Sequence, residues 1–307
     1  SVGLAVNYER YAGVSAFSHA QLSIVGYSNR WMWEEAALGT GGENICFDPL
    51  GSHTRAFVTD MRPKLFDGAW KENVGGMDFL TYFSDGGEFQ YLKALDGMIW
   101  ASGPCLSNAS YDSVTRDGAF SSHVQISGAR SDDLVRVFMT VHISAMKDVS
   151  FSRLAFLQIG AETYNYHAEF QDFVIGTGAD KRKLSRTCTG GTARVPDKMY
   201  SNTAGGVFKE TMSGTAPFYF AMHNNTNPHT LDDSSMVVGD RGLVIRSFQG
   251  RFNGVDTQTP SYSVLCDKIE IGPPSGVVSM KEGDYIHMEV EVLVIPRKGK
   301  EYDLALH

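Results

Sequence analysis

Hydrophobic residues recur at every second position over residues 134–144, mostly with polar residues between them, which is the clearest pattern in this chain. A period of two places successive side chains on opposite faces of a strand and does not fit one side of a helix. The same alternation returns over residues 288–295, and more briefly over residues 121–126 and 243–248. The chain is therefore predicted to contain several strands, each with an apolar face that needs a partner layer.

Turn-forming residues separate these stretches. Glycine follows Asp, Asn or Glu at each of them, and such pairs supply the positive φ angles that tight hairpins require. At most a short helical turn fits residues 33–38, because Gly39 ends it. We expect an all-β protein with little helix, built as one large antiparallel β-sandwich over residues 1–307. The predicted turns are Asp85-Gly86-Gly87, Asp96-Gly97, Asp117-Gly118, Asn253-Gly254 and Glu282-Gly283-Asp284.

The approach to the last predicted strand reads Ser279-Met280-Lys281-Glu282-Gly283-Asp284-Tyr285, and alternating apolar residues follow it to Pro296. This segment resembles the closing strand of the galactose-mutarotase-like β-supersandwich domains, in which a Lys/Pro-Gly-Glu/Asp turn precedes a long alternating strand. Aldose epimerases, many glycosidases and several polysaccharide lyases carry such a domain. The resemblance thus implies a supersandwich and a sugar substrate, without selecting a reaction.

The epimerases of that family depend on two histidines and a late glutamate. The candidates in this chain are His53, His167 and Glu289 or Glu291, and their surroundings do not reproduce the epimerase patterns. No epimerase residue is carried over.

Aromatic and charged residues are densest over residues 29–62. Glycoside hydrolysis needs one protonated and one ionised carboxyl group about 5 to 9.5 Å apart, and burial beside aromatic rings raises the pKa of the first. A competing interpretation is that the tryptophans pack in the core and the glutamates form surface ion pairs. The catalytic candidates are Glu34 or Glu35 as the acid with Glu43 or Asp60 as its partner, and the substrate-binding candidates are Trp31, Trp33 and Arg62.

A second group of candidates suits a polysaccharide lyase, which needs a base near C5 of a uronic acid and a group that neutralises its carboxylate. Half-buried packing residues in a strand are the competing interpretation. The base would be Tyr164, Tyr166 or His167, and Asn165 with Arg153 would hold the uronate.

Metal chemistry has little support. The four cysteines, Cys46, Cys105, Cys188 and Cys266, form no CxxC pair, so no zinc site is expected, and buried free thiols are favoured over disulfides. No cofactor is expected to be required. Ca²⁺ is the one ion considered, because the segment over residues 223–235 carries candidate oxygen ligands, although a polar surface turn is the favoured interpretation. The histidines and carboxylates of that segment are His223, His229, Asp232 and Asp233.

Charge and hydropathy limit the partners. The net charge of −8 has no basic stripe to offset it, so nucleic acid is not an expected partner. The one dense basic run, Lys181-Arg182-Lys183 with Arg186, is expected in a solvated loop over residues 177–200. No apolar stretch approaches the roughly 20 residues of a membrane span, so no membrane association is expected.

The chain begins with Ser, so it is expected to be a processed product or a fragment of a longer protein. Its compartment is left open, with a secreted or periplasmic location as the expectation, and its oligomeric state is likewise open.

The expected function is cleavage of glycosidic bonds in an oligo- or polysaccharide, through paired carboxylates. The alternatives are a polysaccharide lyase with a Tyr or His base and a non-catalytic carbohydrate-binding or structural module. The chain has no GxSxG elbow, no P-loop and no HExxH motif, so serine-hydrolase, nucleotide-dependent and zincin chemistries lack support.

Overall fold

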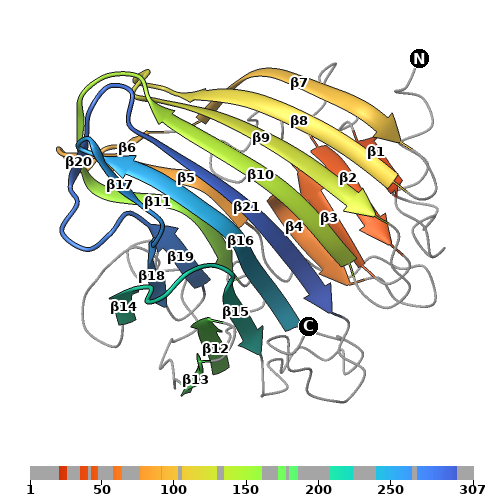
Figure 1. The fold of residues 1–307 in the computed structure, drawn as a ribbon. Coiled ribbons are helices and arrows are strands. Elements are labelled where there is room, and N and C mark those ends of the chain that lie inside the picture. The colour runs from red at the N-terminus through yellow and green to blue at the C-terminus, as the bar shows by residue number, and fades with distance from the viewer. Residues whose placement is uncertain are drawn as a thin grey trace.

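A computed structural model describes residues 21–25, 35–40, 43–47, 58–63, 77–90, 92–102, 106–129, 135–160, 172–177, 180–185, 208–223, 240–264 and 268–295. In these ranges, twenty-one strands form two antiparallel sheets, and no helix occurs (Figure 1). The prediction of an all-β antiparallel sandwich is confirmed. Its extension over residues 1–307 as one domain stays a prediction.

The first sheet has eleven strands in the order β1-β2-β3-β4-β5-β11-β19-β18-β14, with β6 paired to β5 and β20 paired to β11. Its strands are β1 (Gln21–Val25), β2 (Glu35–Thr40), β3 (Glu43–Phe47), β4 (Val58–Pro63), β5 (Met77–Ser84), β6 (Phe89–Gln90), β11 (Val149–Gly160), β14 (Phe208–Thr211), β18 (Ser261–Val264), β19 (Lys268–Gly272) and β20 (Ser279–Met280).

The second sheet has ten strands in the order β13-β12-β15-β16-β21-β10-β9-β8-β7, with β17 paired to β16. Its long central strands run side by side across the front of Figure 1, with β1 to β4 of the first sheet behind them. Its strands are β7 (Leu92–Ser102), β8 (Leu106–Thr115), β9 (Phe120–Ala129), β10 (Val135–Ala145), β12 (Asp172–Thr177), β13 (Asp180–Ser185), β15 (Phe218–His223), β16 (Asp240–Phe252), β17 (Val255–Thr257) and β21 (Tyr285–Ile295).

The hydrophobic core lies between the two sheets and contains aromatic contacts that join them. Phe156 of β11 lies against Phe248 and Phe252 of β16, with ring centroids 6.2 and 5.9 Å apart. Tyr82 of β5 meets Phe120 of β9 edge to face at 5.0 Å, the geometry that aromatic pairs prefer. Burial of these large rings is a main source of the sandwich's stability.

The alternating stretches form the strands that were predicted. Met139, Val141 and Ile143 of β10 are buried in the core, as are Val290 and Val292 of the adjacent strand β21. The alternation of β16 is interrupted once by a bulge between Ile245 and Ser247. A bulge inserts one extra residue, so the buried positions of this strand step from 245 to 248 instead of 247.

Most predicted turns are present. Gly87, Gly118, Gly254 and Gly283 have φ between 70° and 83°, which glycine adopts without steric cost. The turn predicted at Asp96-Gly97 is wrong, because both residues lie inside β7, next to a register shift that accommodates them.

Two other local predictions are corrected. Residues 35–38 belong to strand β2, so the helical turn over residues 33–38 is wrong there. The basic run Lys181-Arg182-Lys183 lies on β13, at the edge of the ten-stranded sheet, and not in a loop. Charged residues are common on edge strands because they discourage pairing with another chain.

The turn that introduces β21 is held by one carboxylate. Asp284 is 2% exposed and accepts hydrogen bonds from the backbone N–H groups of Asn253 (2.5 Å), Lys281 (2.8 Å) and Gly254 (3.1 Å). It therefore joins its own turn to the hairpin of β16 and β17. The Lys-Glu-Gly-Asp motif has a structural role at this end of the sandwich.

A second carboxylate joins the two sheets. Asp117, in the turn between β8 and β9, accepts hydrogen bonds from Tyr82 (3.0 Å), Thr115 (2.8 Å) and the N–H of Ala119 (3.0 Å). Burial opposes ionisation of Asp117, but these hydrogen bonds and the charge of Lys147 outweigh it and lower the pKa of the carboxyl. Burial, reinforced by the charge of Asp117, raises the pKa of Tyr82.

Candidate functional site

The face of the ten-stranded sheet that points away from the core, here called the outer face, is polar and largely accessible. On β10, the outer residues Phe138, Thr140 and His142 alternate with the buried Met139 and Val141. Among the described residues, Phe138 is one of the few large hydrophobic side chains with substantial exposure, at 39%. The alternation that built the core thus also generated a second surface.

Strand register aligns the outer residues into rows that run across the sheet. Directly opposed residues on neighbouring strands lie about 5 Å apart and can act together. Three consecutive rows contribute to the candidate site, and each row lies two residues further along the strands than the row before it. They are Asn108, Ser127, Phe138 and Glu291; then Ser110, Gln125, Thr140, Glu289 and Ser247; then Asp112, His123, His142, His287 and Gln249.

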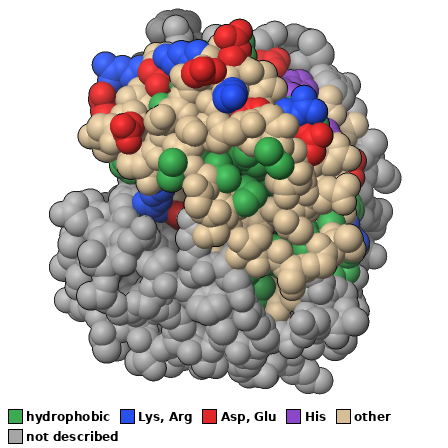
Figure 2. Space-filling model, turned by 60° about the vertical axis from the view of Figure 1, so that its left-hand side comes forward, with side chains coloured by type: hydrophobic (Ala, Val, Ile, Leu, Met, Phe, Trp, Pro, Cys, Tyr) green, Lys and Arg blue, Asp and Glu red, His purple; other side chains and the backbone are tan. Residues whose placement is uncertain are grey.

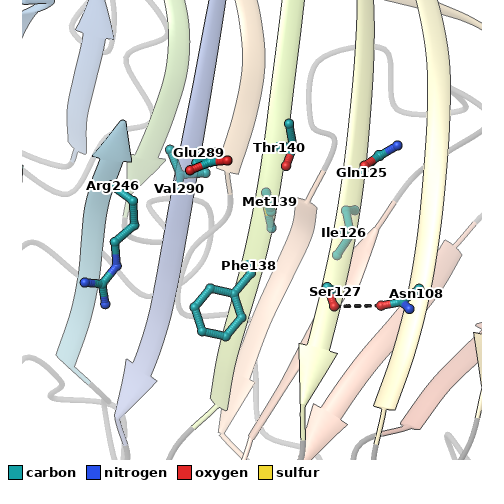
Figure 3. Close-up of a pocket in the computed structure, with 10 residues that line it drawn as sticks. All are labelled: Asn108, Gln125, Ile126, Ser127, Phe138, Met139, Thr140, Arg246, Glu289 and Val290. Atoms are coloured by element: carbon teal, nitrogen blue, oxygen red, sulfur yellow. Dashed lines mark hydrogen bonds between the residues drawn. The ribbon is translucent and has the colours of Figure 1, made fainter. Parts of the chain in front are cut away.

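The first two rows enclose a hollow of about 390 Å³, a size within the range of small-ligand sites. Figure 3 shows the ring of Phe138 between Arg246 of β16 on one side and Ser127 and Asn108 on the other. The hydroxyl of Ser127 donates a hydrogen bond to Asn108 Oδ1 at 2.6 Å. An apolar ring is therefore surrounded by amide, hydroxyl, guanidinium and carboxylate groups. The lining residues are Asn108, Gln125, Ile126, Ser127, Phe138, Met139, Thr140, Arg246, Glu289 and Val290.

One wall of the hollow depends on the bulge in β16. Arg246 is the extra residue there, and bulges commonly redirect a side chain in this way. Its guanidinium donates two hydrogen bonds to Glu291 Oε2, that from Nε at 2.9 Å. Glu291 is only 1% exposed, so Arg246 compensates a buried charge while part of its own side chain stays accessible.

Next to the hollow, Asp112, His123, His142 and His287 form what we call the histidine row. His123 Nδ1 lies 2.6 Å from Asp112 Oδ1, and because a carboxylate only accepts, this nitrogen carries the proton. The rings of His142 and His287 have centroids 6.0 Å apart. In Figure 2, histidine side chains are visible at the edge of the described surface, close to charged groups of both signs.

His142 is surrounded by groups that disfavour its protonation. Burial, followed by the charges of His287 and His123, lowers its pKa below the ordinary value for histidine. Ser144 Oγ lies 3.0 Å from His142 Nε2. The ring of Tyr285 stacks on the ring of His142, with centroids 6.0 Å apart. The row therefore combines proton-accepting imidazoles with neighbouring hydroxyl groups.

The residues predicted for hydrolysis lie elsewhere. Glu35 begins β2, Glu43 begins β3, and Asp60 and Arg62 belong to β4, so three adjacent strands of the eleven-stranded sheet carry them. The pairing of Thr40 with Glu43 places Glu35 and Glu43 at opposite ends of their hairpin, about 17 Å apart along the strand. Trp31, Trp33 and Glu34 lie outside the described residues.

Of the lyase candidates, the structure describes only Arg153. Its guanidinium donates to Glu270 of β19, which also accepts from Gln158, and it lies 5.7 Å from the ring centre of Phe83. It is thus paired with a carboxylate of its own chain. Tyr164, Asn165, Tyr166 and His167 lie outside the described residues.

No group of three or more His, Cys, Asp or Glu side chains that could hold a metal ion occurs among the described residues. Residues 224–239, which contain most of the suggested Ca²⁺ ligands, lie outside them. The described part also contains no helix that is both long and apolar enough to cross a membrane.

Sequence reasoning did not select the outer face as a site. His142 was visible as an outward position of an alternating strand, and His123 and His287 also fall within predicted strands. The missing information was the register, which brings three histidines from distant parts of the chain into one row.

Neither a protein-family model nor a curated protein matches this sequence. Among solved structures, the chain is similar to the galactosidase domain of an alpha-galactosidase-sucrose kinase, with a TM-score of 0.48, 8% identity and coverage of 88% of this chain and 41% of that chain. It is similar to the GH36 alpha-galactosidase AgaB from Geobacillus stearothermophilus, with a TM-score of 0.47, 8% identity and coverage of 90% and 41%.

A third match is a galactose mutarotase related enzyme from Lactobacillus acidophilus, with a TM-score of 0.42, 8% identity and coverage of 87% of this chain and 99% of that chain. This chain spans about two fifths of the length of the two galactosidases. The galactose-mutarotase-like domains that the last strand resembles are thus represented among the matches. At these identities and scores the likeness is one of fold alone.

Proposed function

We propose that this chain is a carbohydrate-active protein that binds a glycan in the hollow on the outer face of the ten-stranded sheet. The observation that carries the proposal is the exposed ring of Phe138 inside a concave surface that also carries amide, hydroxyl, guanidinium and carboxylate groups. Concave surfaces that combine an aromatic side chain with a few polar groups are typical of small-ligand sites.

The chemistry of the lining suits a sugar. A pyranose presents C–H groups on its faces, which pack on an aromatic ring, and hydroxyls around its rim that both donate and accept hydrogen bonds. Gln125 and Asn108 offer amide groups of both kinds, Glu289 offers acceptors and Arg246 offers donors. Each sugar hydroxyl would therefore find a partner while the ring stacks on Phe138.

The binding proposal is tested with Phe138→Ala. Affinity for glycans would be measured by gel retardation and titration calorimetry, and loss of the stacked ring is expected to weaken binding about tenfold, equivalent to about 1.4 kcal/mol. Met146→Ala is the matched control, because Met146 is 53% exposed in the turn between β10 and β11 and lies outside the hollow. Equal affinity of both variants and the parent for every bound glycan would refute the hollow as the site.

For the reaction, we propose hydrolysis of a glycosidic bond, with Glu34 or Glu35 as the acid and Glu43 or Asp60 as its partner. The strand pairing favours Glu35 with Asp60 over Glu35 with Glu43. Asp60 pairs with Cys46, which pairs with Ala37, only two residues from Glu35. Glu35, Glu43 and Asp60 belong to the other sheet, so this proposal is independent of ligand binding in the hollow.

The reaction is tested by replacing each of these four carboxylates singly with its amide. Loss of the true acid should lower the rate of reducing-end release at least about 100-fold. A lyase would instead produce an unsaturated uronic acid that absorbs in the ultraviolet. Full activity of all four variants excludes this assignment, and retention of a glycan without any product identifies a binding module.

A further inference from the structure

We propose that the histidine row recognises an acidic group of the glycan, a carboxylate or a sulfate, and that binding strengthens as the pH falls. This inference rests on the proposed function and adds the class of glycan. It also assigns a role to His142 and His287, which the proposal for the hollow does not use.

The row and the hollow form one continuous surface. His142 follows Thr140 by two residues on β10, and His287 precedes Glu289 by two residues on β21. Alternate residues of a strand lie about 6.6 Å apart on the same face. His142 lies four residues from Phe138, or about 13 Å along β10, so a glycan of several sugar units that stacks on Phe138 and extends along the strands reaches the imidazoles.

The charges around the row leave two imidazoles without an acidic partner. His123 is paired with Asp112, and Arg251 of β16 is paired with Asp256 of β17 at 2.8 Å. Glu289 of β21 accepts a hydrogen bond from Ser247 at 3.2 Å. No carboxylate among the described side chains forms a hydrogen bond or an ion pair with His142 or His287. The remaining titratable group that faces them is Tyr285, which stacks on His142.

Mutual repulsion makes this arrangement responsive to an anion. Two protonated imidazoles on adjacent strands repel each other, which is part of the reason why the pKa of His142 is lowered. An anion placed between them interacts favourably with both charges and so favours proton uptake. By linkage, if a bound anion raises the pKa of the imidazoles, then lower pH must tighten the binding of the anion.

Imidazoles in a cluster also suggest a transition-metal site. Among the described residues, however, no group of three or more His, Cys, Asp or Glu side chains is arranged to hold a metal ion, and Asp112 already occupies Nδ1 of His123. An anion bound through hydrogen bonds needs no such set of ligands.

The experiment measures the affinity of the full chain for hyaluronate, dextran sulfate and neutral dextran at pH 7.5 and 5.5. Carboxyls with an ordinary pKa near 4 stay ionised at both values, so the change lies in the protein. Because the pKa of His142 lies below the ordinary value for histidine, its protonation occurs toward the acid end of this interval, and about tenfold tighter binding is expected at pH 5.5 than at pH 7.5. Comparing the affinity for hyaluronate with that for dextran sulfate shows whether the protein prefers a carboxylate or a sulfate.

The double variant His142→Asn, His287→Asn should bind the acidic probes with equal affinity at both pH values. His223→Gln, a histidine at the end of β15 in the same sheet, is the matched control and should keep the full pH dependence. A pH dependence that persists in the double variant would overturn the inference. So would equal affinity of the parent chain for the acidic probes at the two pH values.

A second measurement does not depend on any variant. Nuclear magnetic resonance titration of the histidine ring protons should show that hyaluronate or dextran sulfate raises the pKa of His142 and His287. Binding of an acidic probe with both values unchanged would overturn the inference. If only the neutral dextran binds, and Phe138→Ala weakens it, the hollow remains a glycan site while the acidic specificity is refuted.

Discussion

Asp284 closes the end of the sandwich at which the chain crosses from β20 in one sheet to β21 in the other. Its carboxylate accepts three backbone N–H groups, from Asn253, Gly254 and Lys281, and is almost completely buried. Asp284→Ala removes all three acceptor contacts without changing the backbone preference strongly. The variant therefore tests whether the Lys-Glu-Gly-Asp motif is mainly structural.

The expected magnitude follows from the three donors that lose their partner. A buried donor without an acceptor costs about 1 to 3 kcal/mol. The surrounding turn residues are exposed, so water reaches the freed N–H groups and the low end of that range applies to each. We expect a loss of about 3 kcal/mol in the free energy of unfolding, which for a chain of this size lowers Tm by about 5 °C.

Urea unfolding followed by circular dichroism provides the assay, and the midpoint should fall while the slope with denaturant stays unchanged. Asp148→Ala is the control, because Asp148 is an exposed carboxylate that accepts one N–H of the same turn, from Glu282 at 2.9 Å. It should lose only about 1 kcal/mol. Asp284→Asn, which keeps one acceptor oxygen, should fall between the two. If Asp284→Ala were no less stable than Asp148→Ala, the structural role of the motif would be refuted.

Three further predictions concern the core, the turn between β8 and β9, and the wall of the hollow. Val292→Asp places a charge in the core and should reduce stability by more than about 4 kcal/mol in thermal unfolding, whereas Thr140→Asp on the outer face should be far milder; equal losses would contradict the assignment of the two faces. Because the pKa of Asp117 is lower in the folded state than in the unfolded state, its contribution to stability is present above about pH 4 and is lost as the pH falls through the folded-state value. The stability difference between the parent and Asp117→Asn, measured by urea unfolding, should therefore be constant from pH 7 to 5 and shrink below pH 4, and a difference that grows in acid would show the opposite shift. Arg246→Ala removes the guanidinium that is paired with the buried Glu291 and should cost about 3 kcal/mol in the same assay, and a neutral effect would show that this ion pair contributes little to stability.

Local patterns were sufficient to predict four of the strands, β9, β10, β16 and β21. The alternation in β10 and β21 follows from the requirement that one face be buried. Gly254 and Gly283 have positive φ and form the turns that precede β17 and β21. These features depend on residues close together in the chain. Such local features are sufficient to predict an all-β sandwich without knowledge of which strands pair.

Other features depend on contacts between distant residues. The turn predicted at Asp96-Gly97 failed because pairing with β8 absorbs this dipeptide into a strand with a shifted register. The bulge that directs Arg246 toward Glu291 arises only when β16 pairs with β21. A local pattern contains no information about which strand lies alongside.

The candidate site illustrates the same division. Alternation alone placed His142 on the face opposite Val141, but it could not tell whether that face was covered or what stood next to it. The register of β9, β10 and β21 decided that His123 and His287 are its neighbours. Periodicity is a property of each strand separately, whereas the composition of a surface is set by the order and register of strands, which only the packed sheets determine.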